Sequence, residues 1–291
     1  MRSHNSGRAR RGFTLIELMV ALVLFGIVGA LFTRLMTVQG KFFDRQGMGN
    51  AARNVSRAAL NRVVSDFRMV ETSGGVVAAT STSITLRIPF AIGVMCKNSG
   101  IGTAVSLLPI DSTTYALATK PGNFYGYAWR SYITGAYSYV ENPATLAAGD
   151  VVDCTSVGVT MVTNGQTVLV TPALPGGGGL GTPVFLYNKI RYEMKASTAV
   201  PGKLGLYRTI VDPNGTLVTE ELVAPFANTA GWKFFTLNGG SVAQAAAPAD
   251  LTTLRGLELH LDGISENIAP GLVANESAPF TTAVYFKNRI N

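Results

Sequence analysis

Glu17 is an ionisable carboxylate in an otherwise apolar stretch of the sequence. It lies near the start of an apolar run, and the sixteen residues that follow it, from Leu18 to Thr33, carry no charge. A charged side chain at the centre of a membrane helix costs about 2.5–3.5 kcal/mol, and less near the interface. In apolar surroundings such a carboxylate needs a partner of opposite charge. Its position therefore predicts a paired carboxylate.

Few other side chains could support catalysis or bind a metal. Beyond the first twelve residues the only histidine is His260, and its alternating surroundings predict a position on the surface of a strand. One histidine and two distant cysteines cannot form a zinc site. Asp150 and Asp153 could contribute to a calcium site, but two carboxylates are too few to define one. Residues 175–181 lack the Lys-Ser/Thr of a phosphate loop and are expected to be flexible. We therefore expect no enzyme, no cofactor and no metal.

A helix of membrane-spanning length is expected to position Glu17. Residues 13–33 are interrupted by charge only at Glu17, and a bilayer core takes about twenty apolar residues as a helix. The leader, residues 1–12, contains four arginines, including Arg8, Arg10 and Arg11, and no acid. This asymmetry predicts that the N-terminus stays in the cytoplasm and that the rest of the chain is exported. A cleaved secretory signal is the alternative, although such a signal has no use for Glu17.

The sequence RRGFTLIELMV, residues 10–20, resembles the class III signal of type IV pilins and of the pseudopilins of type II secretion. In that family a membrane prepilin peptidase cuts after the glycine, and the new N-terminal residue is N-methylated. The resemblance implies cleavage between Gly12 and Phe13 and methylation of Phe13. It also implies that Glu17 pairs with the terminal amine of a neighbouring subunit during assembly, which would give each charge a partner in an apolar interior.

The helical period continues beyond the membrane segment. Apolar side chains recur at spacings of three to five residues: Val55, Leu60, Val63, Phe67 and Val70. We expect a helix from Phe13 to about Val70, roughly 87 Å long, in which residues 34–72 form an amphipathic extension that packs on a sheet. Each glycine costs about 1 kcal/mol relative to alanine, so bending or local melting is expected at Gly26, Gly29, Gly40, Gly47 and Gly49. The arginines of this extension are interpreted as a solvated face and not as a DNA-reading surface.

Residues 73–291 are predicted to form a β-rich head. Apolar and polar residues alternate over 84–88, 190–194, 257–261 and 280–286, as in strands with one buried face. Residues 212–215, DPNG, predict a turn, and Gly74-Gly75 are expected to end the helix. The predicted fold class is α+β, with one long helix packed on an antiparallel sheet.

Parts of the head resemble minor pilins of the W type and pseudopilins of the J type. The similar segments are KIRYEM at 189–194, LYR at 206–208, ELV at 221–223 with Phe226, and FTTAVYFKN at 280–288. Extra sequence around 97–183 is expected to be an insertion. The tip pseudopilin of the K type lacks the acidic residue that Glu17 supplies, so the resemblance to that type is weaker.

The insertion contains an aromatic cluster that allows two interpretations. We favour the core of an inserted β-subdomain, and the alternative is a surface that binds a ligand, a partner pilin or a host. The members are Tyr115, Phe124, Tyr125, Tyr127, Trp129, Tyr132, Tyr137 and Tyr139. Residues 69–291 contain 13 basic and 14 acidic residues, a balance that argues against binding DNA through its phosphates.

Cys96 and Cys154 are the only cysteines, and both lie on the side that is expected to be exported. An even number of cysteines in an oxidising compartment predicts one disulfide. Two unpaired buried thiols are the alternative.

These features together predict a minor pilin that helps to initiate or cap a type IV pilus. Its expected partners are prepilin peptidase, other pilins through the N-terminal helix, and the inner membrane, from which it passes to a pilus or pseudopilus at the cell surface or in the periplasm. A J-type pseudopilin of a type II secretion system is the alternative within the same class. A tip adhesin or DNA-uptake module, with a host or DNA ligand at the head, is the alternative from a different class.

Overall fold

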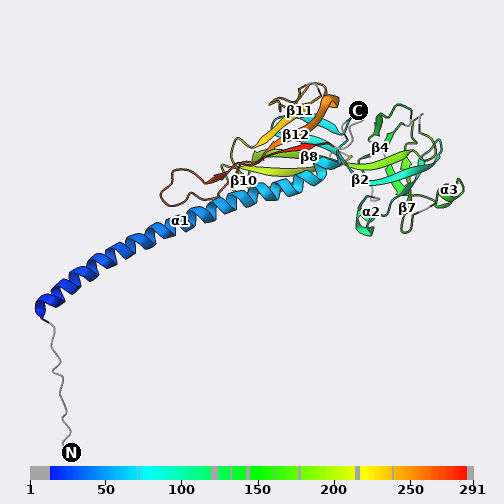
Figure 1. The fold of residues 1–291 in the computed structure, drawn as a ribbon. Helices are drawn as coiled ribbons and strands as arrows, with labels where there is room; N and C mark the ends of the chain where they lie inside the picture. Colours follow the sequence, from blue (N-terminus) through cyan, green and yellow to red (C-terminus); the bar gives the residue numbers. More distant parts are fainter. Residues whose placement is uncertain are drawn as a thin grey trace, which may run out of the picture.

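The computed structural model describes residues 14–71, 73–118, 124–131, 133–141, 145–160, 162–175, 178–213, 217–237 and 239–286. The chain begins with a single helix, α1 (Leu15–Met69), whose 55 residues extend over about 83 Å. Figure 1 shows α1 as a continuous and gently curved rod whose N-terminal half projects away from the head. Bending or local melting was expected at the five glycines; α1 is curved but remains helical through all of them, so only the melting is wrong. Helix formation is cooperative, and isolated glycines do not outweigh the hydrogen bonds on either side of them.

The helix ends earlier than Gly74-Gly75. Val70 is extended and caps α1 through its N–H, which donates to the carbonyl of Phe67 at 3.3 Å. Gly74 lies in the turn that follows, with a φ of 81°, in the left-handed region that favours glycine. A Cβ at Gly74 would also lie 2.5 Å from the ring of Tyr139. The two glycines therefore shape the turn into the first strand and do not stop the helix.

The head consists of two antiparallel sheets with short helices. The larger sheet contains β1 (Val76–Ala79), β2 (Ser83–Asn98), β3 (Thr103–Leu107), β4 (Gly126–Arg130), β5 (Tyr137–Val140), β6 (Thr145–Ala148), β7 (Gln166–Thr171), β8 (Pro183–Ala196), β9 (Leu204–Val211), β10 (Leu217–Phe226), β13 (Gly263–Ile264) and β14 (Ser277–Ala278). The smaller sheet has the order β11 (Gly231–Thr236), β12 (Leu254–His260) and β15 (Thr281–Tyr285). Along the chain, the helix α2 (Ser112–Ala118) follows β3 and the helix α3 (Val152–Thr155) follows β6. A 3-10 turn at Leu251–Thr253 precedes β12. The expected α+β class with an antiparallel head is confirmed.

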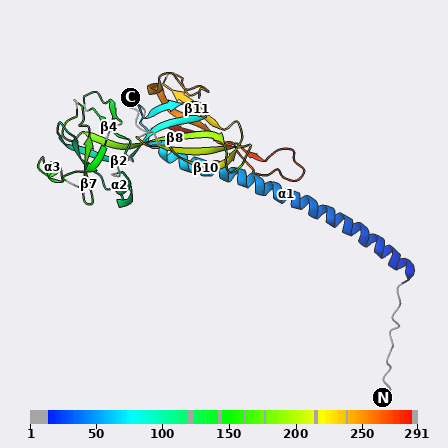
Figure 2. The ribbon, with the colours of Figure 1, turned by 180° about the vertical axis from the view of Figure 1, so that it is seen from behind.

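Strands β2 and β8 are long enough to pass through two lobes. They pair from Ser83↔Glu193 to Val94↔Pro183, and Figures 1 and 2 show them running from the part of the head beside α1 into a second part beyond the end of α1. We call these parts the proximal lobe and the distal lobe. The distal lobe contains the far ends of β2 and β8 together with β3 to β7, α2 and α3.

The C-terminal half of α1 belongs to the core of the proximal lobe. Its buried residues are Ala52, Ser56, Ala59, Val63 and Phe67. The ring of Phe67 packs edge-on against Tyr192 of the larger sheet at 5.5 Å and against Trp232 of the smaller sheet at 6.1 Å, both between ring centroids. Alternating residues of the expected strands complete this core, among them Ile84, Leu86, Ile190, Met194, Leu257 and Leu259. The helix is thus held by both sheets, where the sequence predicted only one.

Candidate functional site

Glu17 forms a capping box at the start of α1. Its carboxylate accepts hydrogen bonds from the backbone N–H and from the hydroxyl of Thr14, each at 2.9 Å. The hydroxyl oxygen of Thr14 in turn accepts from the N–H of Glu17 at 3.3 Å. This reciprocal arrangement satisfies backbone donors that would otherwise lack partners at a helix N-terminus. The carboxylate is therefore held at the first turn of the helix.

No other described part of the chain covers the helix around Glu17. Every described residue from Thr14 to Gly47 is exposed, and Glu17 is the only charged residue among those up to Thr33. Exposed apolar side chains include Leu15, at 79%, and Phe25, at 78%. By length and composition α1 contains a segment that could cross a membrane, and none of that segment is buried against the head. Such a surface can be covered by lipid or by the helices of other subunits.

The residues of the expected cleavage junction lie outside the described residues. These are Gly12 and Phe13, together with Arg8, Arg10 and Arg11 of the leader. Helix α1 begins two residues after Phe13. The capped carboxylate therefore follows the expected junction by four residues.

Buried polar contacts hold the head on α1. The hydroxyl of Ser56 donates to the carbonyl of Leu261 at 2.7 Å and accepts from the N–H of Gly263 at 3.0 Å. The hydroxyl of Tyr192 donates to the carboxylate of Asp66 at 2.5 Å. Burial, together with the nearby charge of Asp66, raises the pKa of Tyr192. These contacts fix the register of the helix against the head.

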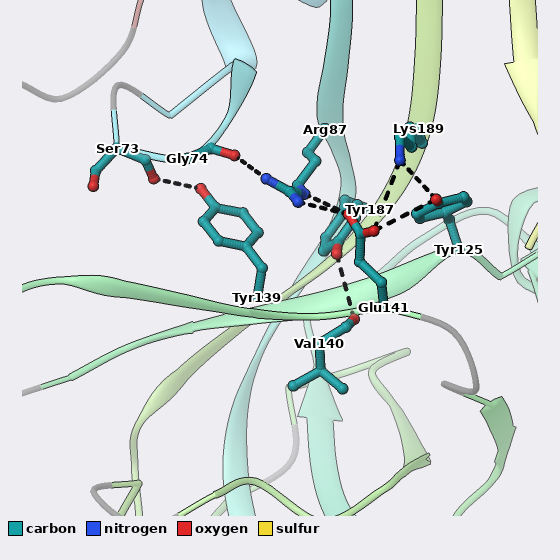
Figure 3. Close-up of polar contacts among 9 residues, drawn as sticks. All are labelled: Ser73, Gly74, Arg87, Tyr125, Tyr139, Val140, Glu141, Tyr187 and Lys189. Atoms are coloured by element: carbon teal, nitrogen blue, oxygen red, sulfur yellow. Dashed lines mark hydrogen bonds and ion pairs between the residues drawn. The ribbon is translucent and has the colours of Figure 1, made fainter. Parts of the chain in front are cut away.

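A polar network joins the turn after α1, the proximal lobe and the distal lobe, and Figure 3 shows its members. Arg87 of β2 donates to the carboxylate of Glu141 at 2.8 Å and to the carbonyl of Gly74. Its guanidinium lies 4.5 Å from the centroid of the Tyr139 ring, and the Tyr139 hydroxyl donates to the carbonyl of Ser73 at 2.8 Å. We call this set the junction network.

Three further side chains complete the junction network. Lys189 of β8 lies 3.7 Å from Glu141 and donates to the hydroxyl of Tyr125 at 2.8 Å. The hydroxyl of Tyr187 donates to the carbonyl of Val140 at 3.3 Å. Because its members come from the α1–β1 turn and from both lobes, the network sets how the distal lobe sits on the end of the helix.

The expected disulfide is confirmed. Cys96 of β2 and Cys154 of α3 are bonded at 2.06 Å. Nearby, Asp153 accepts from the ammonium group of Lys97 at 2.6 Å, which raises the pKa of Lys97. Asp150 accepts from the N–H of Val152 at 2.9 Å. Both carboxylates thus have protein partners, and within the described residues no group of three or more His, Cys, Asp or Glu side chains is arranged to hold a metal ion.

Most of the aromatic cluster forms the interior of the distal lobe and its junction. Phe124, Tyr127 and Trp129 are buried in the distal core, and burial raises the pKa of Tyr127 to about 12. Tyr125 is buried, Tyr137 and Tyr139 are half-buried, and Tyr132 lies outside the described residues. The interpretation as a core therefore holds for the buried members. His260, expected on the surface, is half-buried with Nε2 2.5 Å from a carboxylate oxygen of Glu258.

Sequence reasoning missed two parts of this arrangement. The role of Thr14 could have been predicted from the sequence, because Thr-x-x-Glu at 14–17 is the pattern of a capping box. The pairing of Arg87 with Glu141 could not have been predicted, because the two residues are 54 positions apart and no local sequence pattern indicates that they interact.

Comparison with known proteins bears on the N-terminal region. Residues 7–33 match the family model described as the prokaryotic N-terminal methylation motif. No curated protein and no solved structure has a significant match to the chain. The motif marks a substrate of prepilin peptidase that assembles with other pilins, and it does not mark an enzyme family. The resemblance drawn from residues 10–20 is confirmed. The chain thus carries, within residues 7–33, the class III prepilin signal that type IV pilins share.

Proposed function

We propose that this protein is a minor pilin that helps to initiate or cap a type IV pilus. In this proposal prepilin peptidase cuts between Gly12 and Phe13, and Phe13 is then N-methylated. The leader arginines Arg8, Arg10 and Arg11 hold the N-terminus in the cytoplasm while the head is exported. The observation that carries the proposal is Glu17, the one carboxylate in an otherwise uncharged and fully exposed helical segment.

Assembly follows from the exposed helix. Once the leader is removed, the new amine of Phe13 lies four residues from Glu17, and both charges need partners in an apolar interior. We infer that Glu17 of one subunit pairs with the amine of Phe13 in the next, which sets the axial register. The apolar surface of α1 is then covered by neighbouring helices.

The test is a gene deletion scored in two ways. Loss of surface pili and of twitching motility, with protein secretion intact and restored by the wild-type gene, is the result expected for a minor pilin. Loss of type II secretion with normal pili would instead support the J-type pseudopilin. Normal pili that no longer bind a host surface or DNA would support a tip adhesin or uptake module.

A further inference from the structure

The part of α1 between the uncharged segment and the head has an unusual composition. Residues 34–45 are all exposed. They combine five large apolar side chains with three bases and one acid. The apolar residues are Leu35, Met36, Val38, Phe42 and Phe43, and the bases are Arg34, Lys41 and Arg45. At its end Arg45 lines a pocket together with residues 276–280 of the head, and the rest of the segment projects away from the head in Figures 1 and 2.

The three bases lie on one side of the helix. Arg34, Lys41 and Arg45 are seven and then four residues apart, so their Cα atoms fall within roughly 40° of one another around the axis. The apolar residues occupy the sector beside this stripe, beginning with Val38 and Phe42. Within the described residues none of the three basic side chains forms an ion pair or a hydrogen bond. Asp44 lies on the other flank of the stripe, and Glu276 of the head lines the same pocket as Arg45. A basic stripe beside an apolar and aromatic sector is typical of a helix in the membrane interface.

The length of the exposed helix places this segment. From Leu15 to Arg34 the helix rises about 28 Å, close to the ~30 Å hydrocarbon core of a bilayer. A bilayer with both headgroup layers is ~40–45 Å thick, which leaves about 5–7 Å for each layer, and Lys41 and Arg45 lie about 39 Å and 45 Å from Leu15. If Leu15 lies at one edge of the hydrocarbon, Arg34 therefore lies at the opposite edge. Lys41 and Arg45 lie just outside the headgroup layer on the side of the head, which their long side chains reach when the helix is tilted.

We propose that Arg34, Lys41 and Arg45 bind the phosphate groups of anionic phospholipids in the leaflet on the head's side of the membrane. The long side chains of the bases reach the phosphates while Phe42 and Phe43 cover the acyl boundary. This inference rests on the membrane-anchored state of the proposed subunit and adds to it a defined lipid class. An acidic protein surface is the competing occupant, and the direct continuity of the stripe with the membrane-spanning segment favours lipid.

The test places a local reporter beside the stripe. Phe42→Trp is introduced into the full-length protein, which is reconstituted in vesicles containing equal mole fractions of brominated phosphatidylglycerol or brominated phosphatidylcholine. The native Trp129 and Trp232 are buried in the head and give a constant background. Bromine quenches tryptophan only at short range, so the leader arginines in the other leaflet do not contribute. The stripe variant R34Q/K41Q/R45Q is compared with the matched control R53Q/R57Q/R62Q, which removes the same charge from exposed positions beside the head.

Phosphatidylglycerol should be enriched around the reporter by about fivefold. This is the factor that corresponds to about 1 kcal/mol from one base near an anionic membrane surface. The stripe variant should lose this preference, the matched control should keep it, and salt should weaken it. Equal quenching by both lipids in the unsubstituted stripe would overturn the inference and leave membrane anchoring intact. Equal quenching combined with loss of pilus incorporation in the stripe variant alone would assign the stripe to an acidic protein partner. No quenching by either lipid would overturn both the inference and the anchored state.

Discussion

At the scale of single residues, Glu17 carries the assembly proposal. Glu17→Val removes a charge from an apolar helix, so membrane insertion should be unchanged or improved. The variant should still be processed, but its incorporation into sheared filaments should fall. The amine of a neighbouring Phe13 loses its partner, and breaking a buried pair on one side costs about 3–5 kcal/mol. Fractionation of cells into membrane and filament pools, with detection of the head, measures the effect.

The matched control is Leu18→Val, which alters the neighbouring apolar residue and leaves the carboxylate in place. It should assemble at the wild-type level. Wild-type incorporation of Glu17→Val would show that Glu17 does not set register in this protein.

Glu221 of β10 predicts a pH dependence of the stability of the head. Partial burial alone raises its pKa, but hydrogen bonds from Ser197, Thr198 and Tyr207 outweigh burial and lower the pKa to about 2. The unfolded chain has a value near 4.5. The carboxylate therefore stabilises the folded head fully above about pH 4.5, and this contribution is lost as the pH falls toward 2.

Glu221→Gln should lower the thermal midpoint of the head at pH 7, and the difference from wild type should shrink as the pH approaches 2. Thermal unfolding across this range, followed by circular dichroism, measures it. Glu220→Gln, at the exposed neighbouring position, should have little effect at either pH. A constant difference between wild type and Glu221→Gln at all pH values would contradict the assignment.

At the scale of elements, the disulfide ties α3 to the far end of β2. Cys96 and Cys154 are 58 residues apart, and closing a loop of that length restricts the unfolded chain by about 4 kcal/mol in the chain-entropy model. Cys154→Ser should therefore lower the thermal midpoint of the distal lobe. The double variant of both cysteines should match the single one, because the same link is absent. Unchanged midpoints would mean that the bridge contributes nothing to stability.

The junction network predicts how firmly the distal lobe is attached. Arg87→Gln removes the ion pair with Glu141 and weakens the contact with Gly74. Hydrogen exchange should accelerate in the turn at 73–75 and in β5, while the core of the proximal lobe stays protected. Lys233→Gln, which removes an exposed ion pair in the smaller sheet, is the control and should leave both regions unchanged. Equal acceleration in the two variants would argue against a junction role for Arg87.

The elements differed in how far the sequence predicted them. The helix and the strands around Ile84, Ile190 and Leu257 were predictable, because one face of each is buried and the alternation is regular. The passage of β2 through both lobes was not, because the sequence beyond Pro89 alternates less clearly. The wedging of α1 between two sheets depends on contacts such as that of Ser56 with Leu261, which are 205 residues apart. Long-range pairing of this kind leaves no local pattern.

The residues of the candidate site also differ in whether the sequence predicted them. Glu17 and the two cysteines were found because each is a chemical exception in its stretch of sequence. The junction network was not found, because Arg87 and Lys189 are ordinary outward residues of alternating strands until Glu141 is brought beside them. Residues that act through distant partners require the fold to be known.

At the scale of the whole molecule, the distribution of charge and the shape both distinguish α1 from the head. Residues 34–68, all on α1, carry seven bases and two acids, whereas residues 69–291 are nearly neutral. The long exposed helix, the two-lobed head and the stripe of bases where the helix leaves the uncharged segment are consistent with the proposed subunit, which is anchored in a membrane and assembles through its helix. In the proposed pathway, removal of the leader leaves basic residues only on the head's side of the membrane.

The central claim is that the protein is processed as a prepilin, and the N-terminus of the mature chain tests it most directly. Intact-mass and N-terminal peptide analysis of membrane-extracted protein should find N-methylated Phe13. Substituting Gly12 by leucine should leave the leader attached, whereas the same change at Gly7 should leave processing unaffected. A mature chain that begins at Leu31, as after an ordinary secretory signal, or one that retains the leader in cells with active prepilin peptidase, would contradict the account.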